Sequence, residues 1–343
     1  KGFGEPHRET NPHTMDTRCG VLHWPSHAPA TAMLLAHPPP RRHEEYLRAQ
    51  AGRGQELVMQ MVRSLSSALV YPEAGNVATN EKLWDLYAAE WIPGAAWVRD
   101  MASGNRCADE DAADRNLACV GDEWAPHGDT QAVVDEWIVP YLGDAQSMAA
   151  AEIGSGGGRI ARLVAPHVAG LRCFDVSDKM LAKAKASLEA CPNVTFSHVH
   201  GDGPESEAGF DDKPRSYPTS SRAAYDFVYC FDVMVHMDLH AMFRCLKRIR
   251  ALMKDDDSRA FISTANLLAP AGWARFERQS KYTVGGFYFV TPEAVRLLAA
   301  KAGFAVVRES TPQESNVYYD RDLMLVLKPV DLDAMATVTQ IDP

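Results

Sequence analysis

A glycine-rich turn between an expected strand and an expected helix constrains the fold of this chain more than any other feature. The apolar segment 148–153 is followed by Gly-Ser-Gly-Gly-Gly at 154–158, and a helical pattern continues over 159–168. A strand that reverses so sharply into a helix needs residues without a Cβ, because glycine adopts positive φ and lets the backbone approach a ligand closely. The turn predicts a ligand-binding strand–turn–helix unit, and a simple tight loop is the alternative that the turn alone leaves open.

Strand and helix patterns alternate from this turn onward. We expect strands at 148–153, 171–176, 193–199, 225–231, 259–264, 304–309 and 323–327, and helices at 159–168, 177–190, 239–253 and 292–302. Ser177 is the expected N-cap of the second of these helices. The alternation predicts an α/β fold with a doubly wound sheet.

The rest of the chain lacks the alternating strand and helix patterns of this α/β region. We expect residues 1–42 to form an irregular extension and residues 43–128 to form a helical N-terminal or lid region. Within the second region, helices are expected at 44–70 and 80–91 and a polar loop at 104–116. A further helix is expected at 130–141. The α/β domain is expected over 129–330, with a polar insertion at 203–221, and 331–343 form a C-terminal tail.

Acidic residues follow the expected strands at the edge where open α/β sheets bind ligands. Asp175 ends the second strand, where a carboxylate can accept hydrogen bonds from both hydroxyls of a ribose. Asp202 follows the third strand and can reach an adenine amino group. Phe231 and Asp232 close the fourth strand. Taken singly, Asp175 or Asp202 could equally be a turn residue, but the series occurs in the right order at successive strand ends.

The spacing at the glycine turn differs from that of a dinucleotide-binding site. The glycines alternate as GxGxG, and Arg159 occupies the position of the third glycine of a GxGxxG fingerprint. Glu152 lies two residues before the first glycine. A carboxylate at this position would repel a pyrophosphate, but it would attract the cationic amino group of a cofactor that carries one.

Four segments, Glu152–Arg159, Phe174–Leu181, Gly201–Gly203 and Tyr225–Asp232, closely resemble the motifs of class I S-adenosylmethionine-dependent methyltransferases. The resemblance spans roughly 129–328. It implies a seven-stranded sheet with the last strand antiparallel, S-adenosyl-L-methionine as cofactor and S-adenosyl-L-homocysteine as product.

The resemblance also assigns candidate cofactor-binding residues. It implies that Glu152 and the glycines hold the methionine part, Asp175 the ribose and Asp202 the adenine, although the insertion after Gly203 departs from the compact family pattern. The full set of candidates is Glu152, Gly154, Gly156, Gly158, Arg159, Asp175, Val176, Met180, Asp202, Gly203, Phe231 and Asp232.

Two histidines after the fourth strand are the candidate catalytic residues. His236 and His240 lie beside the expected position of the methyl group, and their spacing puts them on one face if a helix covers both. An imidazole there can act as a base for an acceptor that must lose a proton, or it can orient the acceptor. The alternative is a histidine bonded to the loop backbone. A metal is not expected, because Asp238 does not match the metalloprotease glutamate and a third ligand is not evident.

Two regions are candidates for binding the acceptor. The segment 266–289 follows the fifth strand, and in the family such a segment commonly builds the acceptor pocket; an amphipathic surface helix is the alternative. Aromatic residues upstream of the α/β region could form a lid over the cofactor and the acceptor, or they could serve only to pack the N-terminal helices. The candidate residues are Trp84, Tyr87, Trp124, Arg275, Gln279, Tyr282 and Tyr288. Arginine among them can grip a carboxylate bidentately, so a small polar or carboxylated acceptor is expected.

Composition narrows the classes of partner. The formal net charge of −10 disfavours a nucleic-acid partner, which demands a basic face. The seven scattered cysteines favour reduced thiols, and no apolar run reaches membrane-spanning length. We therefore expect a soluble cytoplasmic protein without a membrane partner, or an organellar one if a targeting segment precedes Lys1. The sequence carries no signal for the oligomeric state.

Several functions compete with methyl transfer to a small molecule on O, S or N. An NAD-dependent oxidoreductase is disfavoured by Glu152 and by the glycine spacing. The acidic charge disfavours an RNA methyltransferase, and no Asn-Pro-Pro-Tyr-like tetrad follows the fourth strand. A protein methyltransferase and a non-catalytic binding scaffold remain as alternatives.

Overall fold

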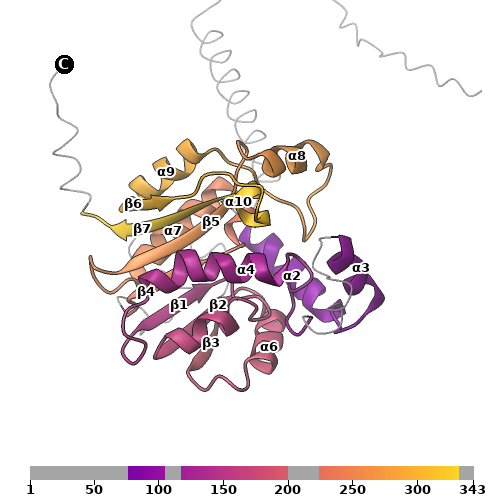
Figure 1. Ribbon diagram of the computed structural model, residues 1–343, viewed down its shortest axis with the longest axis horizontal. Helices are drawn as coiled ribbons and strands as arrows, with labels where there is room; N and C mark the ends of the chain where they lie inside the picture. Colours follow the sequence, from indigo (N-terminus) through magenta and orange to yellow (C-terminus); the bar gives the residue numbers. More distant parts are fainter. Residues whose placement is uncertain (1–75, 105–116, 200–223, 332–343) are drawn as a thin grey trace, which may run out of the picture. The chain divides into compact units, whose positions relative to one another are not determined.

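A seven-stranded sheet forms the centre of the structure, a computed structural model that describes residues 76–104, 117–199 and 224–331. The strands lie in the order β3-β2-β1-β4-β5-β7-β6 (Figure 1). Their bounds are β1 Ala149–Ile153, β2 Gly170–Asp175, β3 Val194–His198, β4 Phe227–Cys230, β5 Arg259–Ala265, β6 Phe304–Glu309 and β7 Asp322–Pro329.

The direction of the strands follows the family expectation. β3, β2, β1, β4 and β5 pair in parallel, whereas β7 runs antiparallel to both β5 and β6. The predicted sheet with an antiparallel last strand is therefore confirmed. The carboxyl ends of the parallel strands meet at one edge, and the glycine turn, Asp175 and Asp232 all follow strands at that edge.

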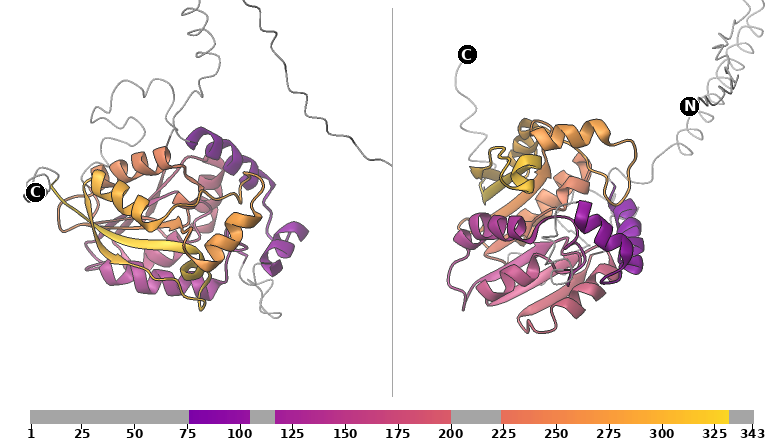
Figure 2. Two further views of the ribbon diagram at one scale, coloured as in Figure 1. Left: turned by 90° about the horizontal axis from the view of Figure 1, so that it is seen from above. Right: turned by 45° about the vertical axis from the view of Figure 1, so that its right-hand side comes forward.

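Helices cover both faces of this sheet, as Figures 1 and 2 show. α7 and α9 pack on one face and α4 and α5 on the other, each with its own cluster of buried side chains. The helices are α2 Val77–Glu90, α3 Ala96–Gly104, α4 His127–Val133, α5 Ala161–Val164, α6 Asp178–Ser187, α7 Leu239–Leu252, α8 Pro270–Arg278, α9 Pro292–Lys301 and α10 Val317–Arg321.

α7 illustrates how the sequence produces a sheet-covering helix. The Asp238 side chain accepts a hydrogen bond from the Ala241 amide and so caps the first turn. Apolar side chains at helical spacing then face the sheet, while Leu239 remains 48% exposed. Ser177 caps α6 in the same way through the amide of Met180, as expected from the sequence.

The expected helices differ from the observed ones mainly at prolines. The helix expected at 159–168 is shortened to α5 and a 3₁₀ turn, Ala165–His167, which contains Pro166. The helix expected at 130–141 begins as α4 and continues through the π-helical turn Val134–Ile138 to a 3₁₀ turn at Pro140. Proline lacks the amide hydrogen that a regular helix needs.

Other expectations lie outside the described residues. These are the extension 1–42, the helix 44–70, nearly all of the loop 104–116, the insertion 203–221 and nearly all of the tail 331–343. Where the chain is described, no helix is long and apolar enough to cross a bilayer.

Replacement of Met242 by alanine tests the packing of α7. Met242 is fully buried, so Met242→Ala should lower the free energy of unfolding by about 2–5 kcal/mol through lost burial and a residual cavity. Leu239→Ala, on the exposed side of the same helix, should change it by less than about 0.5 kcal/mol. Denaturant unfolding of both variants measures this, and equal losses would contradict the assigned helix face.

Candidate functional site

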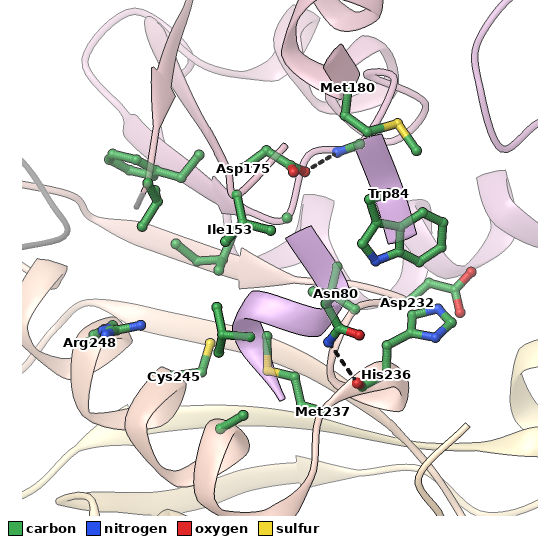
Figure 3. Close-up of a pocket in the computed structure, with 18 of the residues that line it drawn as sticks. Asn80, Trp84, Ile153, Asp175, Met180, Asp232, His236, Met237, Cys245 and Arg248 are labelled. Carbon is green, nitrogen blue, oxygen red and sulfur yellow. Dashed lines mark hydrogen bonds between the residues drawn. The ribbon is translucent and has the colours of Figure 1, made fainter. Parts of the chain in front are cut away.

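A pocket opens at the carboxyl edge of the sheet, between the strand ends and α2 (Figure 3). It encloses about 870 Å³, including space open to solvent. Its walls are Val77, Asn80, Trp84, Trp124, Ile153, Gly154, Gly156, Phe174, Asp175, Val176, Met180, Val199, Asp232, Val233, His236, Met237, Ala241, Cys245 and Arg248.

At the glycine turn, the pocket is lined by backbone without side chains. Gly154 and Gly156 have φ values of 73° and 53°, in the region that favours glycine. A Cβ on Gly154 would come within 2.6 Å of the Val233 side chain, whereas a Cβ on Gly156 would meet no atom within 4 Å. The backbone at Gly156 is thus open to a ligand.

Asp175 lies directly beside this turn. Its carboxylate accepts hydrogen bonds from the amides of Gly156 at 2.8 Å and Ser177 at 2.8 Å, which fix its orientation. Burial raises the pKa of Asp175 to about 6, against the opposing effect of these hydrogen bonds. The site therefore contains a fixed carboxylate, ionised at neutral pH, at the end of β2.

His236 is held as one defined tautomer. Its Nδ1 lies 2.9 Å from the carbonyl oxygen of Gly286, and a carbonyl can only accept, so Nδ1 carries the proton and Nε2 is the acceptor nitrogen. Burial lowers the pKa of His236 to about 4, although Asp232 opposes this shift. The imidazole is consequently neutral at physiological pH.

Asp232 stands at the centre of a buried network of ions. Arg159 donates to it at 3.1 Å and Arg321 at 2.7 Å, and Arg321 also pairs with Asp322 at 2.6 Å. Burial acts to raise the pKa of Asp232, but the two guanidinium groups hold it below its usual value. Asp232 also has a φ of 59°, which is uncommon for a residue other than glycine.

α2 forms the outer wall of the pocket. The amides of Asn76 and Asn80 donate to the His236 carbonyl oxygen at 2.7 and 2.9 Å. Trp84 meets the His236 ring edge to face, with 5.0 Å between the centroids. Asp85 accepts from the Ser177 hydroxyl at 2.6 Å, which ties α2 to the start of α6.

The structure brings together many of the residues selected from sequence. Those that line the pocket are Trp84, Trp124, Gly154, Gly156, Asp175, Val176, Met180, Asp232 and His236. Asp202 and Gly203 lie outside the described residues.

Four candidate cofactor residues have their side chains, or the space of a Cβ, turned elsewhere. Glu152 is 2% exposed and accepts a hydrogen bond from Cys173 within the sheet, because side chains alternate along β1. Gly158 faces Leu188 of the segment after α6, Phe231 packs against Tyr318, and Arg159 is engaged with Asp232. These residues therefore pack around the glycine turn on the side away from the pocket.

The two candidate histidines are separated. α7 begins at Leu239, so His236 precedes the helix in a 3₁₀ turn and the condition for a shared helical face is not met. His240 is exposed, whereas His236 lines the pocket.

The candidate acceptor residues after β5 mostly stabilise their own segment. Arg275 donates to the Gly285 carbonyl at 2.7 Å, and its guanidinium lies 3.8 Å from the Phe287 ring centre. Gln279 bonds both backbone groups of Phe287. Tyr282 stacks on Tyr288 at 4.6 Å. Tyr87, upstream, turns its hydroxyl towards Glu123.

Sequence reasoning missed several pocket residues. Asn80, Val199, Met237, Ala241, Cys245 and Arg248 line the pocket without belonging to any recognisable motif. The amphipathic pattern of α7 could have indicated Ala241 and Cys245 as inward-facing, but not as pocket-lining.

Comparison with protein families gives one match. Residues 151–256 match a family described as a methyltransferase domain. The comparison with curated proteins gives no match.

Solved structures with a similar chain path include two methyltransferases. One is magnesium protoporphyrin IX methyltransferase from Synechocystis PCC 6803, with 18% identity over 59% of this chain and 84% of that chain and a TM-score of 0.44. The other is an S-adenosylmethionine-dependent methyltransferase from Clostridium acetobutylicum, with 10% identity over 60% and 93% of the chains and a TM-score of 0.44.

Titration of His236 tests its environment. With a pKa near 4 in the folded state and about 6.5 when unfolded, the residue binds a proton only in the unfolded chain between these values, so stability falls as pH drops through this window. Histidine ¹⁵N spectra, assigned with His236→Gln, should show the Nδ1–H tautomer and a midpoint near pH 4. A midpoint near 6.5 would contradict the burial of the ring.

Proposed function

We propose that this chain transfers a methyl group from S-adenosylmethionine to O, S or N of a small polar or carboxylated acceptor. The match of residues 151–256 to a family described as a methyltransferase domain and the strand order of the sheet support this proposal. One observation carries the proposal. The open backbone of Gly156 and the fixed carboxylate of Asp175 face the same pocket, beside His236.

The described residues fit this cofactor. Asp175 would accept hydrogen bonds from the ribose, and Val176 and Met180 offer apolar surface for the adenine side. Gly154 and Gly156 would admit the methionine part, because a side chain at Gly156 would project into the space of the pocket. When bound, the cofactor supplies an electrophilic methyl group on a sulfonium.

The contribution of the protein to methyl transfer is mainly alignment and exclusion of water. Charge disperses during the displacement, so a tight orientation of donor and acceptor matters more than charge stabilisation. Asn76 and Asn80 fix the backbone of the turn that bears His236, and Gly286 fixes its ring. Nε2 of His236 can then accept a hydrogen bond or a proton from the acceptor.

Three arginines of the candidate site are already engaged in the observed state, whereas Arg248 lines the pocket. Arg159 and Arg321 are committed to Asp232, and Arg275 to Gly285, so these arginines are not available as a carboxylate clamp in the observed state. Arg275 could bind a carboxylate only after leaving Gly285. The proposed acceptor group is a hydroxyl, thiol or amine on a small polar or carboxylated molecule.

Ligand-induced stabilisation tests the identity of the cofactor. S-adenosylhomocysteine at about 100 times its Kd should add about 2.7 kcal/mol to the free energy of unfolding, and NAD should add nothing. Asp175→Ala should weaken binding by about 1–3 kcal/mol, because hydrogen bonds to a charged group are lost. Calorimetry measures both, and stabilisation by NAD alone would exclude a methyltransferase.

Turnover of a His236 variant tests the chemistry. A screen of metabolite pools with methyl-labelled cofactor first identifies the acceptor. If that acceptor must lose a proton, His236→Ala should reduce kcat by about 10²–10⁴ with cofactor affinity unchanged. With the cofactor at saturation, wild-type kcat should then decline as pH falls towards 4, where His236 becomes protonated.

An acceptor with a free lone pair gives a different expectation. No base is then needed, so the loss should be smaller and the pH profile flat. Full activity of His236→Ala on an acceptor that must be deprotonated would rule out this role, and absence of any transfer would leave a binding scaffold.

A further inference from the structure

Trp84 lies at the centre of a group of aromatic rings on the wall formed by α2. Its ring centroid is 5.9 Å from that of Tyr87, 5.6 Å from that of Trp124 and 5.0 Å from that of His236. Trp84, Trp124 and His236 line the pocket, and Figure 3 shows Trp84 beside His236. Three neighbouring rings therefore fix how the Trp84 indole is presented to a ligand.

A buried chain of hydrogen bonds holds this group in place. Trp124 Nε1 donates to the Tyr87 hydroxyl at 2.9 Å, and the Tyr87 hydroxyl donates to Glu123. Glu123 is fully buried, and its second carboxylate oxygen accepts from the Gly121 amide at 2.9 Å. The chain links α2 to the segment before α4, and each of these two segments contributes one tryptophan to the pocket lining.

The charges around the pocket make the aromatic wall formed by α2 a candidate surface for binding a cation. Asp232 is already matched by two arginines, and the imidazole of His236 is neutral. Among the described side chains at this end of the pocket, the aromatic faces are therefore electron-rich surfaces that can meet a cation, together with the Nε2 lone pair of His236. An aromatic face attracts a desolvated cation, most strongly when the ring is that of tryptophan.

The covalent structure of the methyl donor would place its charge near Trp84. The sulfur joins the ribose to the methyl group, so with the ribose at Asp175 and the methyl group towards His236, the sulfonium would lie between these residues. Trp84 contacts His236 and lines the same pocket as Asp175.

We propose that Trp84 recognises the positive charge of the sulfonium, and that Tyr87 and Glu123 are positioning residues that hold it there. The inference rests on the proposed function and extends it. It explains how the site can prefer the charged donor to the uncharged product, which must leave after each turnover.

Calorimetry with two non-reacting ligands tests this preference. Sinefungin carries a protonated amine where the donor has its sulfonium, and S-adenosylhomocysteine is neutral at that position. Trp84→Leu should weaken sinefungin binding roughly 3- to 30-fold more than S-adenosylhomocysteine binding, which is the effect of one cation–π contact. Trp84→Phe, which keeps an aromatic face, should retain most of the preference.

Tyr87→Phe tests the positioning chain, and the protein contains a matched control. Trp137 Nε1 donates to the Tyr319 hydroxyl, which in turn donates to Glu136, so the same three residue types form a chain of the same order. Trp137 and Tyr319 belong to the core on one face of the sheet, and Glu136 is exposed at its edge. Tyr87→Phe should reduce the preference for sinefungin about 3-fold, whereas Tyr319→Phe should leave it unchanged. Both variants lose the same kind of hydrogen bonds.

Each outcome decides the inference. Equal losses for both ligands in Trp84→Leu, or no loss, would overturn it while leaving the proposed function intact. If Trp84→Leu does not fold, the comparison of Tyr87→Phe with Tyr319→Phe decides, and equal effects in the two would overturn the positioning role. Failure of the wild-type protein to bind either ligand would overturn the proposed function, and this inference with it.

Discussion

The ion network around Asp232 is the constraint on which the pocket depends. Arg159 reaches it from the end of the glycine turn and Arg321 from the end of α10, directly before β7, while Asp232 itself follows β4. A buried carboxylate needs such partners, because the cost of removing a charge from water is large unless it is paired. Pairing one carboxylate with two distant arginines therefore fixes three strand ends relative to one another.

This network also explains the backbone at Asp232. A φ of 59° costs free energy in a residue with a Cβ, and such strain persists where the surroundings over-determine the conformation. Here two ion pairs and a hydrogen bond from the Asp232 amide to Ser263 supply that constraint. The strained turn directs the chain from β4 towards His236, at the mouth of the pocket.

α2 closes the pocket by contacts of a different kind. Polar contacts join it to His236 and to the start of α6, and aromatic contacts join it to Trp124. A wall built from a separate segment adds the indole of Trp84 to the side chains that the strand ends supply. The sheet edge and α2 thus contribute differently to the pocket. The sheet edge holds polar groups in fixed positions, and α2 forms the wall of the pocket opposite these groups.

Local sequence determined the sheet and the polar edge of the site. Alternating patterns predicted all seven strands, and Gly154, Gly156 and Asp175 were recognisable because a sharp turn and a strand end impose requirements on single residues or short segments. Such requirements are written in neighbouring positions. The same locality explains why Ser177 was identified correctly as an N-cap.

Only the tertiary structure decided which side chains line the pocket. Glu152 matched a motif but turns into the sheet, Arg275 is bonded to its own loop, and Asn80 enters the pocket without any motif. The pairing of Asp232 with Arg321 joins positions far apart in the chain. Orientation and long-range pairing depend on how packed elements meet, and that information is not contained in any short stretch of sequence.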